Sequence, residues 1–190
     1  MLIGEKFRRL FLAIDAPLEA SEIIKLINKE NPYLKNIRWM RLQNLHLTIY
    51  FIGNTHQNNF DKIYEISQNI ISNFSSFTIY PENVCLMPIQ HPRMIWIKYK
   101  TNPIFTELYH LLHYALKDFK LSSEQIYNEP IPHITLARFS KLNNNKIFIP
   151  EIEKINLQPI QITEIKMWET ISSQISSDYK KHEAIIKLKK

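Results

Sequence analysis

Two short segments of this chain repeat one pattern of residue types, and that pattern could do chemistry. His46 and Thr48 lie in Leu45–Ile52, and His133 and Thr135 lie in Ile131–Phe139. In both places the residues between and after the histidine and threonine are aliphatic: Leu47, Ile49, Ile134 and Leu136. Side chains alternate between the two faces of a β-strand, so each strand would present one imidazole and one hydroxyl together and bury the aliphatic pair.

Two imidazoles and two hydroxyls in one cleft suit phosphodiester hydrolysis without a metal ion. An imidazole titrates near neutral pH, so one histidine can accept a proton while the other donates one. The hydroxyls of Thr48 and Thr135 could donate hydrogen bonds to phosphate oxygens. Arg138, three residues after Thr135, could stabilise charge on the phosphorane. Because the repeat is symmetric, its spacing does not assign which histidine is the acid.

The elements that must position these residues follow the same repeat. Strand, helix and strand patterns are predicted at 10–14, 17–31 and 45–52, and again at 94–97, 103–119 and 131–139. Equivalent points lie about 85 to 90 residues apart, which indicates two similar lobes that face each other. A further helix is predicted at 60–74, strand pieces at 77–80 and 84–87, closing strands at 160–168 and 184–188, and a turn at 143–145.

Composition narrows the partners and cofactors. The net charge of +6 favours a polyanion such as nucleic acid, although several lysines crowd the C-terminal end. Two glycines cannot form a glycine-rich phosphate loop, and one cysteine, Cys85, excludes an intrachain disulfide or a cysteine metal cluster. We therefore expect no cofactor and no bound metal.

The chain shows neither a secretion signal nor a stretch that approaches the ~18–20 apolar residues of a membrane span. We expect a cytoplasmic monomer with no membrane contact.

The remaining histidines and several aromatic residues carry weaker expectations. His110 and His113 could in principle bind a metal ion, but no further ligand is evident in the sequence, and neither residue lies on the apolar stripe of its helix. The other three histidines, His56, His91 and His182, are expected to be solvent-exposed. The candidates for stacking on a nucleobase are Trp39, Trp96, Tyr127 and Trp168.

The sequence resembles the 2H phosphoesterase superfamily, which is named for its paired His-x-Thr/Ser-x motifs, and within it the RNA 2′,3′-cyclic phosphodiesterases, also called 2′-5′ RNA ligases. The resemblance spans most of the chain and is carried by these segments: Arg9–Ile14, Ile37–Trp39, Asn44–Thr48, Phe51–Gly53, Pro132–Arg138, Trp168–Thr170 and Tyr179. Thr170 and Ile175–Ser177 depart from the Ser and Gly that are frequent in the family's closing segment.

The resemblance implies an α+β fold of two pseudo-twofold-related lobes. Each lobe would have an antiparallel sheet with flanking helices, and the two would surround a central active-site groove. We expect one such domain over residues 1–190, with lobes at approximately 1–90 and 91–190 whose closing strands are able to exchange.

The family's roles make His46 the general acid and His133 the general base. The implied activity is metal-independent hydrolysis of 2′,3′-cyclic phosphate ends of RNA to 2′-phosphomonoesters, with weak reversible 2′-5′ ligation as a further option. Two alternatives stay open at this point: a 2H phosphodiesterase that acts on small nucleotides, and an RNA-binding module with an idle pocket.

Overall fold

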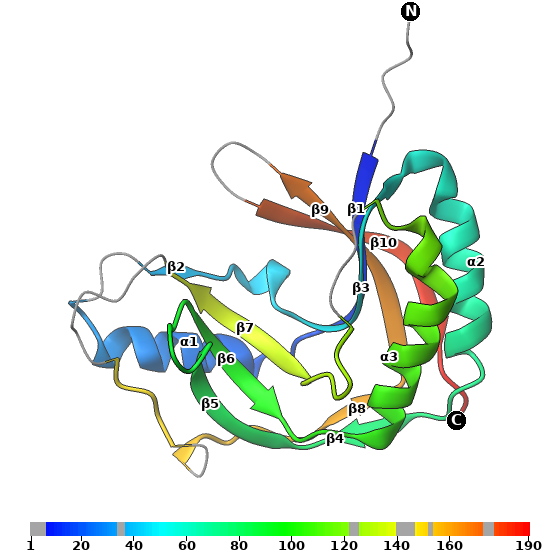
Figure 1. Cartoon of the computed structure of the whole chain (residues 1–190). Coiled ribbons are helices and arrows are strands. Elements are labelled where there is room, and N and C mark those ends of the chain that lie inside the picture. The colour runs from blue at the N-terminus through cyan, green and yellow to red at the C-terminus, as the bar shows by residue number, and fades with distance from the viewer. Residues whose placement is uncertain (1–6, 34–36, 122–125, 140–146, 152–153, 173–176) are drawn as a thin grey trace, which may run out of the picture.

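The computed structural model describes residues 7–33, 37–121, 126–139, 147–151, 154–172 and 177–190. The fold is α+β with antiparallel sheets and flanking helices, as predicted, and Figure 1 shows their arrangement. The strands and helices are β1 (Phe7–Asp15), α1 (Glu19–Glu30), β2 (Arg38–Trp39), β3 (His46–His56), α2 (Phe60–Ile71), β4 (Phe77–Ile79), β5 (Pro81–Met87), β6 (Met94–Tyr99), α3 (Pro103–Leu116), β7 (His133–Arg138), β8 (Ile160–Ile162), β9 (Glu164–Ser172) and β10 (Ser177–Lys187).

The main sheet runs in the order β10-β9-β1-β3-β7-β6-β5, and β2 pairs with β7. All of these pairs are antiparallel. The two strands that carry the repeated motif, β3 and β7, are neighbours, and their recorded pairing is between Leu47 and Ile134. The repeated motifs therefore meet at the centre of the sheet, although 87 residues of sequence separate the two histidines.

Helices from each half of the sequence pack on strands from the other half. Helix α1 contacts β7, whereas α3 contacts β3 and α2; in Figure 1, α2 and α3 lie together on one side of the molecule and α1 lies on the other. Strands β9 and β10, from the C-terminal end, extend the sheet beside β1. The division into lobes near residue 90 stays a prediction.

Helix α3 shows why the local sequence folds as expected. Pro103 occupies its first turn, where a missing N–H costs nothing, and the Asn102 side chain accepts hydrogen bonds from the N–H groups of Ile104 and Phe105 at 2.9 and 3.1 Å. The buried face consists of Phe105, Leu108, Tyr109, Leu112, His113 and Leu116, which is the periodicity of an amphipathic helix.

Strand β1 separates two apolar clusters. Leu10, Leu12 and Ile14 enter the main core, whereas Phe11 and Ala13 point to the other face and form a small cluster with Trp168 of β9. The alternation of a strand thus supplies both the main core and a second apolar floor.

Two irregularities in β3 change which side chains share that second face. The pairing of β1 with β3 shifts register between Leu12 and Ala13 and again between Leu10 and Phe11. Each shift inserts an extra residue in β3, as a β-bulge does. Gly53, at the second bulge, has a φ of 84°, a value that favours glycine. The bulge between Thr48 and Tyr50 brings Phe51 to the same pocket as His46 and Thr48, although strict alternation would have placed it opposite.

Some predicted boundaries were wrong. The segment predicted as one strand at 160–168 is two strands, β8 and β9, which belong to different sheets, and the closing strand begins at Ser177 and not at residue 184. Strand β2, only two residues long, was not predicted. The predicted turn at 143–145 lies outside the described residues. Within the part of the chain that the structure describes, no helix is long and apolar enough to cross a membrane.

Neighbouring leucines on α3 provide a matched test of this packing. Leu112 is fully buried, whereas Leu111 is 44% exposed. We expect Leu112→Ala to lower the free energy of unfolding by about 2–5 kcal/mol, because it leaves a cavity. Leu111→Ala should change it by less than about 0.5 kcal/mol, because both residues are good helix formers. Urea denaturation measures both, and equal losses would contradict this packing of α3.

Candidate active site

The two motif histidines are held in the same way. The Nδ1 atom of His46 lies 2.7 Å from the carbonyl oxygen of Asn44, and the Nδ1 atom of His133 lies 2.8 Å from the carbonyl oxygen of Ile131. A carbonyl oxygen can only accept, so each Nδ1 carries the proton and donates it. In the neutral ring, Nε2 is then left without a proton and can accept one.

The register of β3 and β7 brings both motifs to one face. Leu47 and Ile134 are paired and fully buried in the main core. One step to either side of this pair, the antiparallel register sets His46 against Thr135 and Thr48 against His133, on the opposite face. The structure therefore brings all four predicted motif residues together about an approximate twofold through the Leu47–Ile134 pair.

Different aromatic surroundings support the two imidazoles. The His46 ring lies 4.9 to 5.0 Å, between centroids, from the rings of Phe11, Trp168 and Tyr179, with Tyr179 edge-on. The His133 ring stacks on Trp96 at 3.6 Å with an interplanar angle of 16°. Packing and a backbone hydrogen bond together fix each ring orientation.

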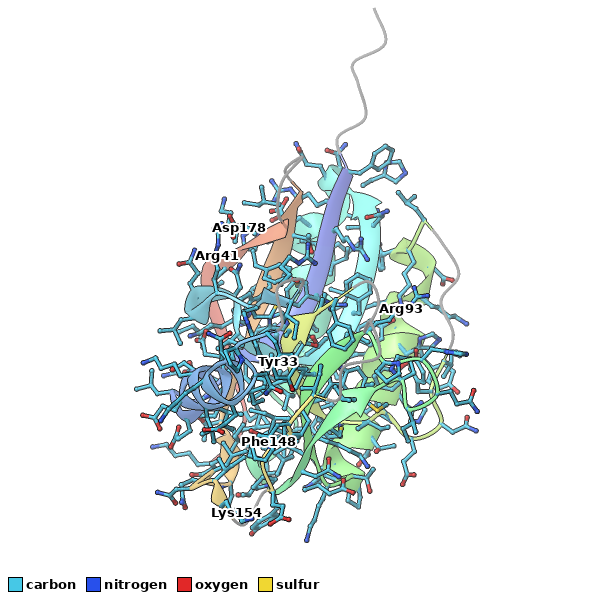
Figure 2. The ribbon with its side chains drawn as sticks, turned by 90° about the vertical axis from the view of Figure 1, so that its left-hand side faces the viewer. Tyr33, Arg41, Arg93, Phe148, Lys154 and Asp178 are labelled. Carbon is cyan, nitrogen blue, oxygen red and sulfur yellow. The ribbon has the colours of Figure 1, made fainter. Side chains whose placement is uncertain are left out.

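A polar cluster holds the carbonyl group that orients His46. Asn44 is 3% exposed, and its Nδ2 donates to Oδ1 of Asp178 at 3.0 Å. Arg41 donates to both oxygens of the same carboxylate at 3.2 and 3.1 Å. Figure 2 shows Arg41 and Asp178 side by side. Strand β10 thus anchors the short 3₁₀ turn Leu42–Asn44 in front of β3.

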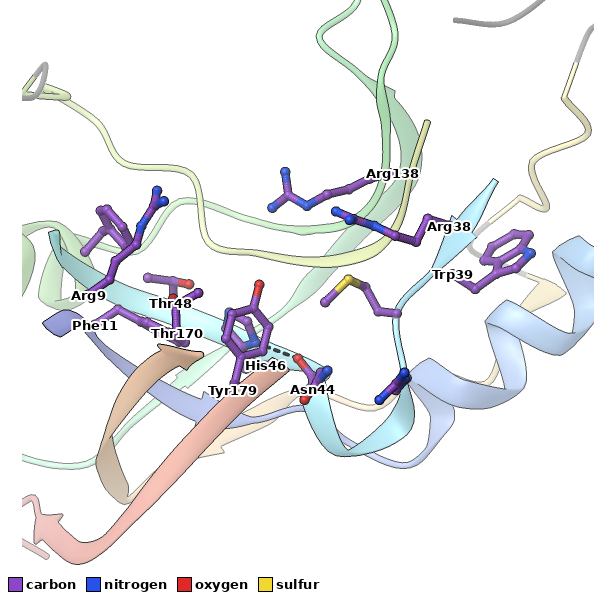
Figure 3. A pocket seen from close by; sticks show the side chains of 13 residues that line it. Arg9, Phe11, Arg38, Trp39, Asn44, His46, Thr48, Arg138, Thr170 and Tyr179 are labelled. Atoms are coloured by element: carbon purple, nitrogen blue, oxygen red, sulfur yellow. Dashed lines mark hydrogen bonds between the residues drawn. The ribbon is translucent and has the colours of Figure 1, made fainter. Parts of the chain in front are cut away.

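A pocket of about 550 Å³ opens over this face, and Figure 3 shows it from close by. Its lining is basic and aromatic: Arg9, Phe11, Arg38, Trp39, Met40, Arg41, Asn44, His46, Thr48, Phe51, Arg138, Thr170 and Tyr179. Three of the five predicted site residues, His46, Thr48 and Arg138, are in this lining. His133 and Thr135 border the same face from β7 but are not part of the lining.

Burial and neighbouring charge both disfavour a charged imidazole here. Burial, the largest cause, lowers the pKa of His46 to about 4, with smaller contributions from His133, Arg138 and Lys181 and an opposing one from the hydrogen bond to Asn44. Burial likewise lowers the pKa of His133, the hydrogen bond to Ile131 opposes this, and Arg138 adds to it. Both rings are thus neutral at pH 7 in the unliganded protein.

Several residues of this site escaped sequence reasoning. Asn44 directly precedes the first motif, so its place beside His46 could have been read from the sequence. Nothing in the sequence pattern indicated the roles of Asp178, Arg41 and Tyr179. Their contacts with the site depend on the pairing of β10 with β9 and on the path of the 3₁₀ turn. Among the proposed stacking residues, Trp39 lines the pocket, Trp96 is stacked on His133, and Trp168 is fully buried. Tyr127 is exposed and lies outside the pocket lining.

Two expectations about the other histidines were wrong. His113 lies on the buried face of α3, 3.4 Å from the Tyr50 hydroxyl. The His182 side chain is 14% exposed, pairs with Glu169 and packs on Phe60. His110 contacts the carbonyl oxygen of Asn128. Among the described residues, no group of three or more His, Cys, Asp or Glu could hold a metal ion.

The acidic titration of the two rings can be checked directly. In a ¹H NMR titration of the free protein, we expect the His46 ring to titrate near pH 4 and the His133 ring below 6.5. Arg138→Gln should move both midpoints to higher pH, because removing a nearby positive charge makes protonation easier. A His46 midpoint at 6.5 or above would contradict the burial described here.

Comparisons with known proteins agree with this geometry. Residues 15–96, which include the first motif, match the family model described as LigT like Phosphoesterase. The chain is 27% identical over 166 residues to a protein of Methanocaldococcus jannaschii named RNA 2′,3′-cyclic phosphodiesterase, over 85% of this chain and 91% of that protein. It is 28% identical over 167 residues to a protein of the same name from Thermotoga maritima, over 81% of each chain.

Solved structures share the fold over almost the whole chain. E. coli LigT complexed with 3′-AMP matches with a TM-score of 0.75 at 20% identity, over 97% of this chain and 100% of that one. The protein TT0787 of Thermus thermophilus matches with a TM-score of 0.75 at 16% identity, over 94% of this chain and 97% of that one. The chain thus carries a match to the LigT-like phosphoesterase (2H superfamily) domain over residues 15–96, and it is similar over most of its length to the relatives and structures named above.

Proposed function

We propose that this enzyme opens 2′,3′-cyclic phosphodiester ends of RNA by hydrolysis and leaves a 2′-phosphomonoester. The observation that carries the proposal is the pair of imidazoles on β3 and β7, each with Nδ1 bound to a backbone carbonyl group and Nε2 free to exchange protons. The names of the relatives and the basic pocket support RNA as the substrate.

The proposed reaction is an acid–base hydrolysis. His133 takes a proton from a water molecule, whose oxygen attacks phosphorus while the bond to the 3′ oxygen breaks. His46 gives its proton to that leaving oxygen, which becomes the 3′ hydroxyl, and the phosphate stays on the 2′ oxygen. The assignment of acid and base follows the family's roles, since the symmetric geometry fits either order.

The other three proposed site residues stabilise the negative charge that develops on the phosphate oxygens; they are Thr48, Thr135 and Arg138. The two threonine hydroxyls donate hydrogen bonds to the non-bridging oxygens, and the Arg138 guanidinium pairs with the same oxygens. Because these interactions strengthen as charge develops in the transition state, they lower the barrier. If a 5′ hydroxyl of RNA replaces water as the nucleophile, the same groups join two strands by a 2′-5′ bond. Reversible ligation is therefore a side reaction of the proposed chemistry.

The low pKa of His46 fits an acid that is charged only when substrate is present. A phosphate anion beside the imidazole stabilises the imidazolium and raises its pKa. Binding of the cyclic phosphate would then supply the condition for proton donation.

The test uses an RNA that ends in a 2′,3′-cyclic phosphate, with excess EDTA present. We expect turnover to continue, because the proposed steps use side chains alone. His46→Ala and His133→Ala should each lower kcat by about 10²–10⁴, the usual effect of removing a positioned acid or base. His91→Ala is the matched control, because His91 is exposed and lies outside the pocket.

The product identifies which bond breaks. We expect a 2′-phosphate that a phosphatase specific for 3′ phosphates does not remove. Release by that phosphatase would reverse the roles of His46 and His133. Loss of activity in EDTA that a divalent ion restores, or normal rates in either histidine variant, would contradict the proposed mechanism.

A further inference from the structure

Two arginines face each other across the strand pair at the edge of the pocket. Arg38 on β2 is the direct antiparallel partner of Arg138 on β7. Directly paired residues project from the same face of a sheet, and like charges in that position are destabilising. Both residues line the pocket, and in Figure 3 both side chains extend over it from the same side.

Nothing in the described part of the chain offsets this repulsion. Neither arginine forms an ion pair there, and the hydrogen bond recorded for the Arg138 side chain goes to the Met94 thioether at 3.2 Å. Of the other two arginines that line the pocket, Arg41 pairs with Asp178, and Arg9 lies over the ring of Phe51. The facing pair therefore concentrates positive charge at the edge of the pocket.

The two arginines stand on different strands and differ in their effect on the histidines. Arg138 lowers the pKa of both His46 and His133, so its charge lies close to the reacting position. Arg38 is not among the groups that shift either imidazole. Arg38 stands on a separate strand, β2, which pairs with β7 at the end that carries Arg138, away from His133.

We propose that Arg38 binds the phosphodiester next to the cyclic end, while Arg138 binds the cyclic phosphate itself. A planar guanidinium pairs well with two phosphate oxygens, and a neighbouring phosphate also removes the repulsion between the arginines. This inference rests on the proposed function and narrows its substrate class. The preferred substrate is an oligonucleotide with at least one internal phosphodiester, and a cyclic mononucleotide is a poor one.

The test compares Arg38→Gln with the wild-type protein on two substrates, cytidine 2′,3′-cyclic phosphate and a trinucleotide that ends in a 2′,3′-cyclic phosphate. We expect the ratio of kcat/KM for the trinucleotide to kcat/KM for the mononucleotide to fall by about 10–100-fold, the effect of one charge-assisted bond. Lys25→Gln, which removes one charge from the exposed side of α1, should leave the ratio as it is.

A binding measurement separates this inference from the proposed function. The probe is a fluorescent trinucleotide that ends in a 2′-phosphate, followed by anisotropy, and Arg38→Gln should weaken its binding about 10–100-fold. The same variant should raise the Tm of the free protein by about 1–3 °C, because it relieves the repulsion.

Each outcome decides one of the two ideas. If neither cyclic substrate is hydrolysed but Arg38→Gln still weakens the probe, the proposed function fails and the phosphodiester subsite stands. If the variant lowers activity on both substrates equally, Arg38 acts on the reacting phosphate. If it changes neither the ratio nor the binding of the probe, Arg38 is a solvated surface charge. Either of the last two results would overturn the inference.

Discussion

The contact between Leu47 and Ile134 is the constraint on which the rest of the site depends. These two residues are buried on the core side where β3 pairs with β7. Because side chains alternate along a strand, the burial of this pair directs the residues on either side of it to the opposite face, over the pocket. A slip of one residue in either strand would turn the imidazole of that strand into the core and its aliphatic side chain into the pocket. Hydrophobic burial thus sets the geometry of the polar groups.

The surroundings of the two histidines keep them neutral until an anion enters. Aromatic packing against His46 and His133 fixes the rings and removes water, and removing water disfavours the imidazolium. Arg138 acts in the same direction on the pKa of both rings. In the proposed mechanism, a negatively charged ligand beside the imidazoles stabilises the imidazolium and so raises the pKa of the ring that donates the proton.

The strand motifs were predictable because they obey the two-residue period, and α3 because it carries both a cap and an apolar face. The placement of Phe51 was not predictable, since the bulge between Thr48 and Tyr50 shifts it to the pocket. The role of Asp178 was not predictable either, because it contacts Asn44, which lies 134 residues earlier in the sequence. His113 and His182 were misjudged because their burial depends on contacts distant in sequence: the Tyr50 hydroxyl lies beside His113, and Glu169 and Phe60 lie beside His182.

The central claim is that β3 and β7 place His46 and His133 in one shared phosphate site. The most direct measurement is a long-range ¹H–¹⁵N NMR titration of histidine-labelled protein with inorganic phosphate at a pH near 6.5. The account predicts that Nε2 of both rings responds with a single shared dissociation constant, while both Nδ1 atoms remain protonated. A response confined to one ring, or two different dissociation constants, would contradict it.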